Sequence, residues 1–232
     1  MLGALLDLAL PRACAGCGTP GSALCATCEG AVAAELRAGP TVASPVPAPA
    51  TLPPTVAATA YAGVTRALVL AHKERGRAEL ARPLGLLMTG AIAAAAPTEP
   101  FVLVAVPSTA AARRRRGRDP LRAITRAAVP LLRELGCEVA ELRMLRVVGR
   151  PRDQAGLSGR ERATNLAGVL AARREDPGGP VVLVDDVLTT GATLAEAARA
   201  VRAAGADVRA AAVIAATALT ATLDPPLRRE SS

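Results

Sequence analysis

Residues 181–194 read VVLVDDVLTTGATL, and they contain the most informative pattern of the chain for its fold. Four apolar residues, 181–184, indicate a short buried strand, and the alanine-rich sequence after residue 193 indicates a helix. Two adjacent carboxylates, three threonines and a glycine lie near this junction. A turn of this kind from a strand into a helix presents free backbone N–H groups and the positive end of the helix dipole. The stretch therefore predicts an anion-binding site with two carboxylates beside it.

Strand and helix patterns alternate on both sides of this stretch. We expect further strands at residues 55–63, 101–107, 137–145 and 207–217, and helices at 63–76, 78–96, 121–136 and 159–170. Segments 108–120 and 149–158 are polar and are expected to be loops. Such alternation predicts an α/β fold in which helices flank an open parallel sheet.

The composition is that of a globular chain with a positive net charge. Of 232 residues, 51% are apolar, which is ample material for a core. The net charge of +8 comes from 27 arginines and a single lysine, and it is compatible with phosphate ligands, with nucleic acid or with a solvated surface. Tyr61 and Phe101 are the two aromatic residues, which argues against a single-strand binder built on stacking platforms.

The first ten residues do not have the pattern of a secretory signal, because they lack a basic front and are interrupted by Asp7. No stretch of the chain has the length of apolar sequence that a membrane-spanning helix needs. We therefore expect a cytoplasmic protein with no membrane insertion.

We divide the chain into four parts. Residues 1–39 hold four of the five cysteines, residues 56–222 hold the α/β pattern, and residues 223–232 form a tail expected to be flexible. Between them, residues 40–55 contain six prolines and no charged residue. Proline this dense removes helix and ladder hydrogen bonds, so we expect an extended, semi-rigid linker.

The cysteines of the first part follow the spacing C-x2-C-x7-C-x2-C. Two close pairs, each closing a short chelate loop, suit a tetrahedral zinc ion whose four thiolates leave no position open for catalysis. A disulfide pair or a redox motif is the alternative, but the absence of a signal pattern and of a βαβ pattern here favours structural zinc. The predicted ligands are Cys14, Cys17, Cys25 and Cys28. Cys137 stands apart and reads as an ordinary buried thiol.

Each part of the 181–194 stretch suits a ribose that carries a 5′-phosphate and, at its anomeric carbon, a pyrophosphate. A buried strand, an acidic pair and a T-T-G-x-T turn, in that order, resemble the 5-phosphoribosyl 1-pyrophosphate signature of type I phosphoribosyltransferases. Asp185 and Asp186 would then accept hydrogen bonds from the ribose hydroxyls. The phosphate would be held by Val187, Leu188, Thr189, Thr190, Gly191, Ala192 and Thr193. An NTPase strand is the weaker alternative because the chain has no G-x-x-x-x-G-K-[ST] motif.

A second set of residues extends the resemblance over most of the chain, apart from the linker. Lys73, Pro107, Ser108, Arg115, Arg116, Gly117, Gln154, Leu157, Arg162 and Asn165, with the cysteines in front, are similar to the ComF family. Members of that family have a zinc-binding front module and a phosphoribosyltransferase-like domain, and the family is linked to DNA uptake in naturally competent bacteria. The chain departs from its usual R-G-F-N-Q pattern, because Gly117 is followed by Arg118, Asp119 and Pro120.

The resemblance implies roles for several of these residues. Pro107 and Ser108 would form the pyrophosphate loop, Arg115 and Arg116 would lie in a catalytic loop, and Lys73 would contact phosphate. A surface position is the alternative for the lysine, and a solvated loop or a nucleic-acid contact is the alternative for the basic loop. His72 is assigned no role. Arg162 and Asn165 lie three positions apart on an expected helix and can share a face.

Two functions follow. The first is binding of 5-phosphoribosyl 1-pyrophosphate with Mg²⁺, with transfer of the phosphoribosyl group to an acceptor and release of pyrophosphate; no segment of the chain is assigned to a nucleobase acceptor. The second is a non-catalytic adaptor for single-stranded DNA or a helicase. The sequence does not indicate an oligomeric state.

Overall fold

The computed structural model describes residues 13–108, 117, 119–149, 166–217, 219 and 221–222. Its helices are α2 (Ala26–Ala38), α3 (Gly63–Glu74), the 3₁₀ turn η1 (Ala78–Leu80), α4 (Ala81–Ala95), α6 (Pro120–Glu134) and α8 (Ala192–Ala203). Its strands are β1 (Thr41–Val42), β2 (Thr55–Ala60), β3 (Phe101–Ala105), β4 (Val139–Glu141), β5 (Leu145–Val147), β6 (Leu170–Ala172), β7 (Val181–Leu188), β8 (Val208–Ala216) and β9 (Ala221–Thr222).

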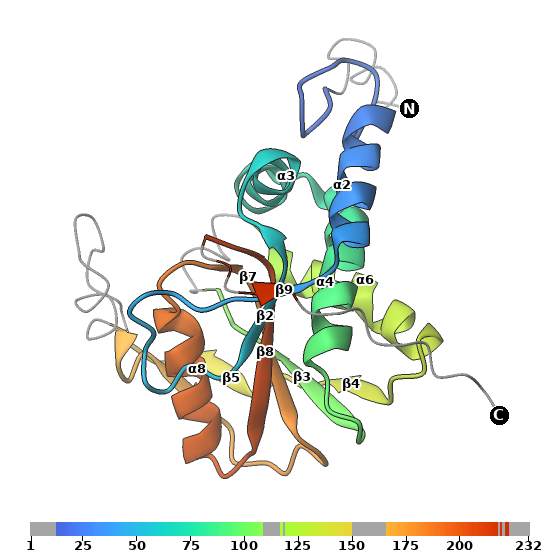
Figure 1. Ribbon diagram of the computed structural model, residues 1–232. Coiled ribbons are helices and arrows are strands. Elements are labelled where there is room, and N and C mark those ends of the chain that lie inside the picture. Colours follow the sequence, from blue (N-terminus) through green and yellow to red (C-terminus); the bar gives the residue numbers. More distant parts are fainter. Residues whose placement is uncertain are drawn as a thin grey trace, which may run out of the picture.

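A central sheet has the strand order β4-β3-β7-β8-β2-β1-β9. The strands from β4 to β2 are parallel to one another, whereas β1 is antiparallel to both β2 and β9. Helices α4 and α6 cover one face and α8 covers the other (Figure 1). Because both faces are covered, the central strands are continuous apolar runs rather than alternating ones. The α/β fold with a mostly parallel sheet is confirmed.

The sheet has a topological switch point between β3 and β7. From β3 the chain passes through α6 to β4 at one edge, while from β7 it passes through α8 to β8 in the opposite direction. The two connecting helices therefore lie on opposite faces of the sheet (Figure 1). In open α/β sheets a crevice forms outside the carboxyl ends of strands at such a point.

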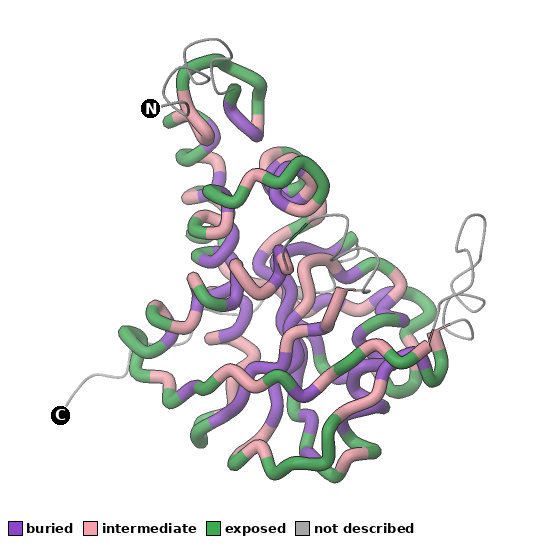
Figure 2. Tube along the Cα trace, turned by 180° about the vertical axis from the view of Figure 1, so that it is seen from behind, coloured by how far each residue is buried: buried purple, intermediate pink, exposed green. Residues whose placement is uncertain are grey.

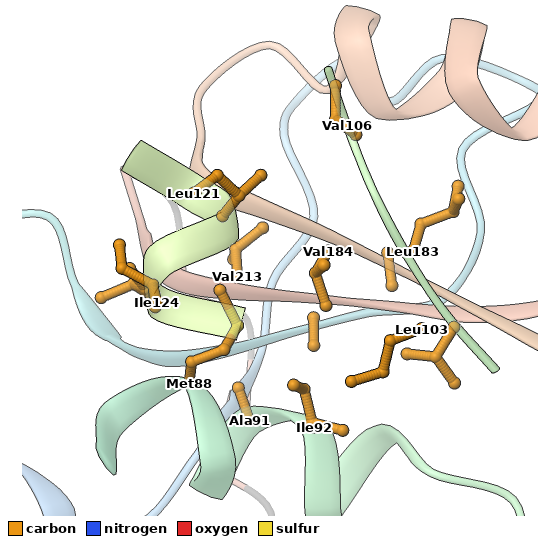
Figure 3. Packing of buried hydrophobic residues seen from close by; sticks show 14 of the residues in the cluster. Met88, Ala91, Ile92, Leu103, Val106, Leu121, Ile124, Leu183, Val184 and Val213 are labelled. Carbon is orange, nitrogen blue, oxygen red and sulfur yellow. The ribbon is translucent and has the colours of Figure 1, made fainter. Parts of the chain in front are cut away.

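The core lies between the sheet and the α4–α6 pair. Met88, Ala91 and Ile92 of α4 pack toward Leu103, Leu183, Val184 and Val213 of the strands and toward Leu121 and Ile124 of α6 (Figure 3). On the other face α8 presents Ala197 and Ala198, which are fully buried and allow a close approach to the sheet. Figure 2 shows that buried residues concentrate along the strands, whereas most of α2 is exposed or half-buried.

Three secondary-structure predictions are corrected. Strand β7 does not end at Val184 but continues to Leu188, because its second half pairs with β8 through Asp185, Val187 and Leu188. The strand expected at 137–145 divides into β4 and β5, since the chain leaves the central sheet after Glu141 and β5 pairs with β6 instead. The helix expected at 159–170 ends earlier, because residue 170 begins β6; residues 159–165 lie outside the described residues.

The segment expected to be an extended, semi-rigid linker, residues 40–55, makes contacts with the α/β fold at several points. Thr41 and Val42 of this segment form β1, which pairs with β2, and the Ala43 N–H donates to the Thr55 carbonyl at 2.9 Å. Farther along, the Thr51 hydroxyl donates to the Ala195 carbonyl at 3.3 Å, and Arg202 Nη1 donates to the Thr51 carbonyl at 3.0 Å. The segment therefore packs along α8. The domain boundaries at residues 39, 55 and 222 stay predictions.

Within the described ranges, no helix combines the length and the apolar character that crossing a membrane requires.

Two glycines of α4 provide a matched test of the α4–α6 contact. A Cβ atom on Gly85 would lie 2.7 Å from the Ala127 Cβ atom, whereas one on Gly90 would meet nothing within 4 Å. Alanine has a higher helix propensity than glycine at both sites, so this contribution cancels when the two variants are compared. The remaining difference in their free energies of unfolding reports the packing against α6. We expect Gly85→Ala to be less stable than Gly90→Ala by about 1–3 kcal/mol in urea unfolding, because of overpacking. Equal stabilities would contradict the close helix contact.

Candidate functional site

The turn between β7 and α8 has the geometry of an anion site. Gly191 caps the amino end of α8 with a φ of 73°, a left-handed conformation that favours glycine. The first intrahelical bond runs from the Ala195 N–H to the Gly191 carbonyl, so the amides before it have no partner inside the helix. A Cβ atom on Gly191 would also come within 3.1 Å of Leu52 in the segment that packs over this turn. These free amides lie at the positive end of the helix dipole.

Asp185 and Asp186 lie on β7 just before this turn, and each carboxylate is held by the next backbone N–H. The Asp186 N–H donates to Asp185 Oδ1 at 2.8 Å, and the Val187 N–H donates to Asp186 Oδ1 at 2.9 Å. Lys73 Nζ of α3 lies 2.5 Å from Asp186 Oδ2. The pair thus joins β7 to a helix that is more than a hundred residues away in the chain.

Burial, reinforced by the charge of Asp186 and opposed by Lys73, raises the pKa of Asp185 to about 8. The acidic pair therefore holds a proton near neutral pH. A cation or a hydrogen-bond donor that enters the site would favour the ionised form and displace that proton.

A cavity of about 520 Å³ opens at the carboxyl ends of β3 and β7, at the switch point. Helix α3, the end of β3, the start of α6, the β5–β6 hairpin, the end of β7 and α8 all contribute to its wall. Of the residues that the sequence singles out, the wall contains Lys73, Pro107, Ser108, Asp185, Asp186, Val187, Thr189 and Thr193. The structure therefore brings the expected pyrophosphate loop, acidic pair and phosphate turn around one space.

The other candidate residues are placed differently. Leu188 is buried, and its carbonyl accepts the Thr217 N–H at 3.0 Å, so it anchors the turn to the end of β8. Thr190, Gly191 and Ala192 complete the turn itself. The candidates Arg115, Arg116, Gln154, Leu157, Arg162 and Asn165 lie outside the described residues.

Glu196 is a residue of the cavity wall that the sequence did not single out. Its carboxylate accepts the Leu170 N–H at 3.0 Å and hydrogen bonds from Arg199 at 2.6 and 2.8 Å, and Arg199 Nη2 also donates to the Leu170 carbonyl. Burial would raise the pKa of Glu196, but the hydrogen bonds from Arg199 and Leu170 hold it below its usual value. The Glu196–Arg199 ion pair thus fixes β6 to α8. In the sequence, the only indication of this pair is the spacing of three residues between a glutamate and an arginine on an expected helix.

His72 has a structural position. It is 1% exposed, and its Nδ1 and Nε2 atoms lie 2.9 Å from the Arg77 carbonyl and 3.0 Å from the Pro120 carbonyl. The side chain therefore joins the end of α3 to the start of α6, next to the cavity.

The four amino-terminal cysteines form a cluster with the donor set of a zinc site. The sulfur atoms of Cys14, Cys17, Cys25 and Cys28 all lie within 4.8 Å of one another. All are free thiols, and the sulfur atoms of Cys17 and Cys25 lie 3.6 Å apart. Burial and the neighbouring thiols raise the pKa of Cys28 to about 12, and a bound cation would allow this thiol to ionise. The cluster could hold a zinc ion.

The backbone around these cysteines is shaped for the cluster. The Gly18 N–H donates to the Cys14 carbonyl at 2.9 Å, and Gly18 has a φ of 82°, as a tight turn after the first pair requires. Cys25 caps α2, so Cys28 lies in the first turn of that helix. A Cβ atom on Gly16 would lie only 2.6 Å from the Cys28 sulfur atom. The space beside the sulfur atoms is therefore closed to a side chain.

Comparison with known families agrees with this geometry. The family model described as phosphoribosyl transferase domain matches residues 98–226, which include the pyrophosphate-loop candidates, the acidic pair and the phosphate turn. The chain belongs to the phosphoribosyl transferase domain family. Comparison with curated proteins gave no match.

Gly16 and Gly30 provide a matched test of the cysteine cluster. We expect Gly16→Ala to weaken zinc binding at least tenfold, because its Cβ atom would displace the Cys28 sulfur atom. Gly30→Ala is the control, since a Cβ atom there meets nothing within 4 Å and the residue lies within α2. Competition with a chromophoric chelator measures both affinities. Equal affinities in the two variants would contradict the arrangement of the cluster.

The raised pKa of Asp185 predicts a pH dependence of stability. Between its ordinary value of 3.8 and about 8, the folded protein keeps a proton that the unfolded chain releases. The free energy of unfolding should therefore decrease as pH rises through this window, and Asp185→Asn should flatten that decrease. Urea unfolding from about pH 5 to about pH 8 measures both slopes. The exposed Asp207→Asn is the control, and parallel curves for wild type and Asp185→Asn would contradict the assignment.

Proposed function

We propose that this chain binds 5-phosphoribosyl 1-pyrophosphate in the cavity at the carboxyl ends of β3 and β7. The observation that carries the proposal is the meeting of three groups around one space: Pro107 and Ser108 after β3, the acidic pair on β7, and the turn before α8. The family match supports the same ligand.

Each part of the ligand has a complementary part of the cavity. The amides of the turn, with the hydroxyls of Thr189 and Thr193, suit the 5′-phosphate. Asp185 and Asp186 suit the two ribose hydroxyls, which donate hydrogen bonds to carboxylates. The pyrophosphate then extends toward Pro107 and Ser108, which line the same cavity after the end of β3. Mg²⁺ would neutralise the pyrophosphate and polarise the bond that breaks.

Lys73 has two partners in this scheme. In the structure its ammonium group neutralises Asp186, whose side chain is only 14% exposed. A bound pyrophosphate would offer a stronger anion in the same cavity, and a flexible lysine can pair with it. The ribose hydroxyls would then replace the ammonium group at Asp186.

We infer that the family's transfer reaction is the activity of this site. The nucleophile of an acceptor would form a bond with the anomeric carbon as the bond between that carbon and pyrophosphate breaks. The electron pair leaves with pyrophosphate, so no nucleophile from the protein is required. Arg115 and Arg116 are the candidates for stabilising the charge that develops on the leaving group.

We further propose that the chain is a ComF-type protein in which the four cysteines hold a structural zinc ion. The supporting observations are the cysteine cluster in front of the phosphoribosyl transferase domain and the residues that match the family pattern. An adaptor for single-stranded DNA or a helicase is the second candidate, favoured by the net charge of +8.

The variant Asp185→Asn/Asp186→Asn tests the proposed ligand. Calorimetry with Mg²⁺ should show binding of 5-phosphoribosyl 1-pyrophosphate to the wild type and at least about hundredfold weaker binding to the double variant, since two charged hydrogen-bond acceptors are lost. Asp207→Asn changes an exposed carboxylate directly before β8, at the opposite end of the sheet from the turn, and should bind like the wild type.

Two results would contradict the proposal. The first is no binding by the folded, zinc-loaded wild type, and the second is equal binding by the double variant. If the wild type fails to bind this ligand but shows salt-dependent DNA binding that survives the double substitution, the adaptor function takes its place.

A further inference from the structure

Helix α3 lies between the four-cysteine cluster and the cavity. In Figure 1 the cysteine-bearing loop lies at the top of the view, α3 lies beneath it, and the sheet lies below α3. Val69, Leu70, Lys73 and Glu74 of this helix are part of the cavity wall. A change in the position of α3 would therefore change the shape and the charge of the cavity.

Arg77 connects the region after α3 to the cysteine loop. Its Nη1 atom donates to the Ala13 carbonyl at 2.8 Å, and its Nη2 atom donates to the Ala23 carbonyl at 3.3 Å. Ala13 directly precedes the first cysteine, and Ala23 lies two residues before the third. The planar guanidinium group thus holds both halves of the cluster together, and the Glu79 carboxylate orients it through a 2.6 Å hydrogen bond to Nε.

The backbone of Arg77 connects in turn to the cavity. Its carbonyl lies 2.9 Å from His72 Nδ1, and the other ring nitrogen of His72 lies 3.0 Å from the carbonyl of Pro120. Pro120 is in the cavity wall at the start of α6, and the next residue after His72 is Lys73, the partner of Asp186. Arg77 and His72 therefore connect the carbonyls of the cysteine loop to Lys73 in the cavity wall.

The opposite end of α3 is braced against the same module. The hydroxyl of Thr65, which is fully buried, donates to the Glu35 carboxylate of α2. The Val64 side chain lies within 3.6 Å of the position that a Cβ atom of Gly16 would occupy in the cysteine loop. Helix α3 thus contacts the module near its first turn as well as beyond its last turn.

From these contacts we propose that Arg77 is a positioning residue that couples metal binding at the four cysteines to ligand affinity in the cavity. This inference depends on the proposed function. When a metal ion holds the cysteine loop, the Ala13 and Ala23 carbonyls are fixed, and Arg77 holds the end of α3 in the position that keeps Lys73 in the cavity wall, within reach of the ligand. When the loop is released, the carbonyls no longer hold the guanidinium group. Ligand affinity and metal affinity are then linked, and the linkage is reciprocal.

The test measures binding at both sites in wild type, Arg77→Ala and Arg77→Lys, each loaded with zinc. Calorimetry with 5-phosphoribosyl 1-pyrophosphate and Mg²⁺ gives ligand affinity, and competition with a chromophoric chelator gives zinc affinity with and without the ligand. Arg75→Ala is the matched control, because Arg75 is an exposed arginine two residues earlier in the same segment. Circular dichroism establishes that each protein is folded.

We expect Arg77→Ala to bind the ligand about tenfold more weakly than the wild type, within the range typical of coupled sites, while its four cysteines still bind zinc. In the wild type the ligand should raise zinc affinity by about the same factor, and in Arg77→Ala it should not. Arg77→Lys should behave like Arg77→Ala, because a lysine cannot reach both carbonyls with a planar fork. Arg75→Ala should behave like the wild type.

Ligand affinity in Arg77→Ala equal to that of the wild type would overturn the coupling, as would zinc affinity in the wild type that does not respond to the ligand. Both results presuppose that the zinc-loaded wild type binds the ligand. A wild type that does not bind it would overturn the proposed function itself, so the two failures are distinguishable.

Discussion

The parallel pairing of β3 with β7 is the constraint on which the rest of the site depends. Val102 lies opposite Val181 and Ala105 lies opposite Val184, so both strands reach the same edge of the sheet in register. Because the chain leaves them in opposite directions through α6 and α8, their carboxyl ends stay uncovered by a crossover. The residues after β3 and the acidic pair of β7 therefore face one space, although about 80 residues separate them in the chain.

The charges around this space determine which chemical groups a ligand needs. Two carboxylates lie at the end of an apolar strand, where burial disfavours the charge of Asp185. One ammonium group, from Lys73, offsets part of this cost, and the amino end of α8 adds a positive dipole. The site is thus charged on both sides, with donors for phosphate groups and acceptors for hydroxyls. A sugar that carries phosphate groups satisfies both kinds of partner.

Much of this arrangement was predictable from local sequence, because a buried strand, an acidic pair and a glycine turn are features of one short segment. The family resemblance added Pro107 and Ser108. The rest depends on contacts between distant parts of the chain. No local pattern joins Arg77 to the Ala13 and Ala23 carbonyls or Glu196 to Leu170. The prolines before Thr55 indicated an extended linker, but no local pattern indicated the hydrogen bonds that join Thr51 to Ala195 and Arg202.

The most direct test of the central claim is a crystal structure of the zinc-loaded protein with Mg²⁺ and 5-phosphoribosyl 1-pyrophosphate. We expect the 5′-phosphate on the amides between Thr189 and Thr193, the ribose hydroxyls on Asp185 and Asp186, and the pyrophosphate beside Pro107 and Ser108. Lys73 should no longer contact Asp186. A ligand bound elsewhere, or bound in the cavity with its 5′-phosphate away from the turn, would contradict the proposed site.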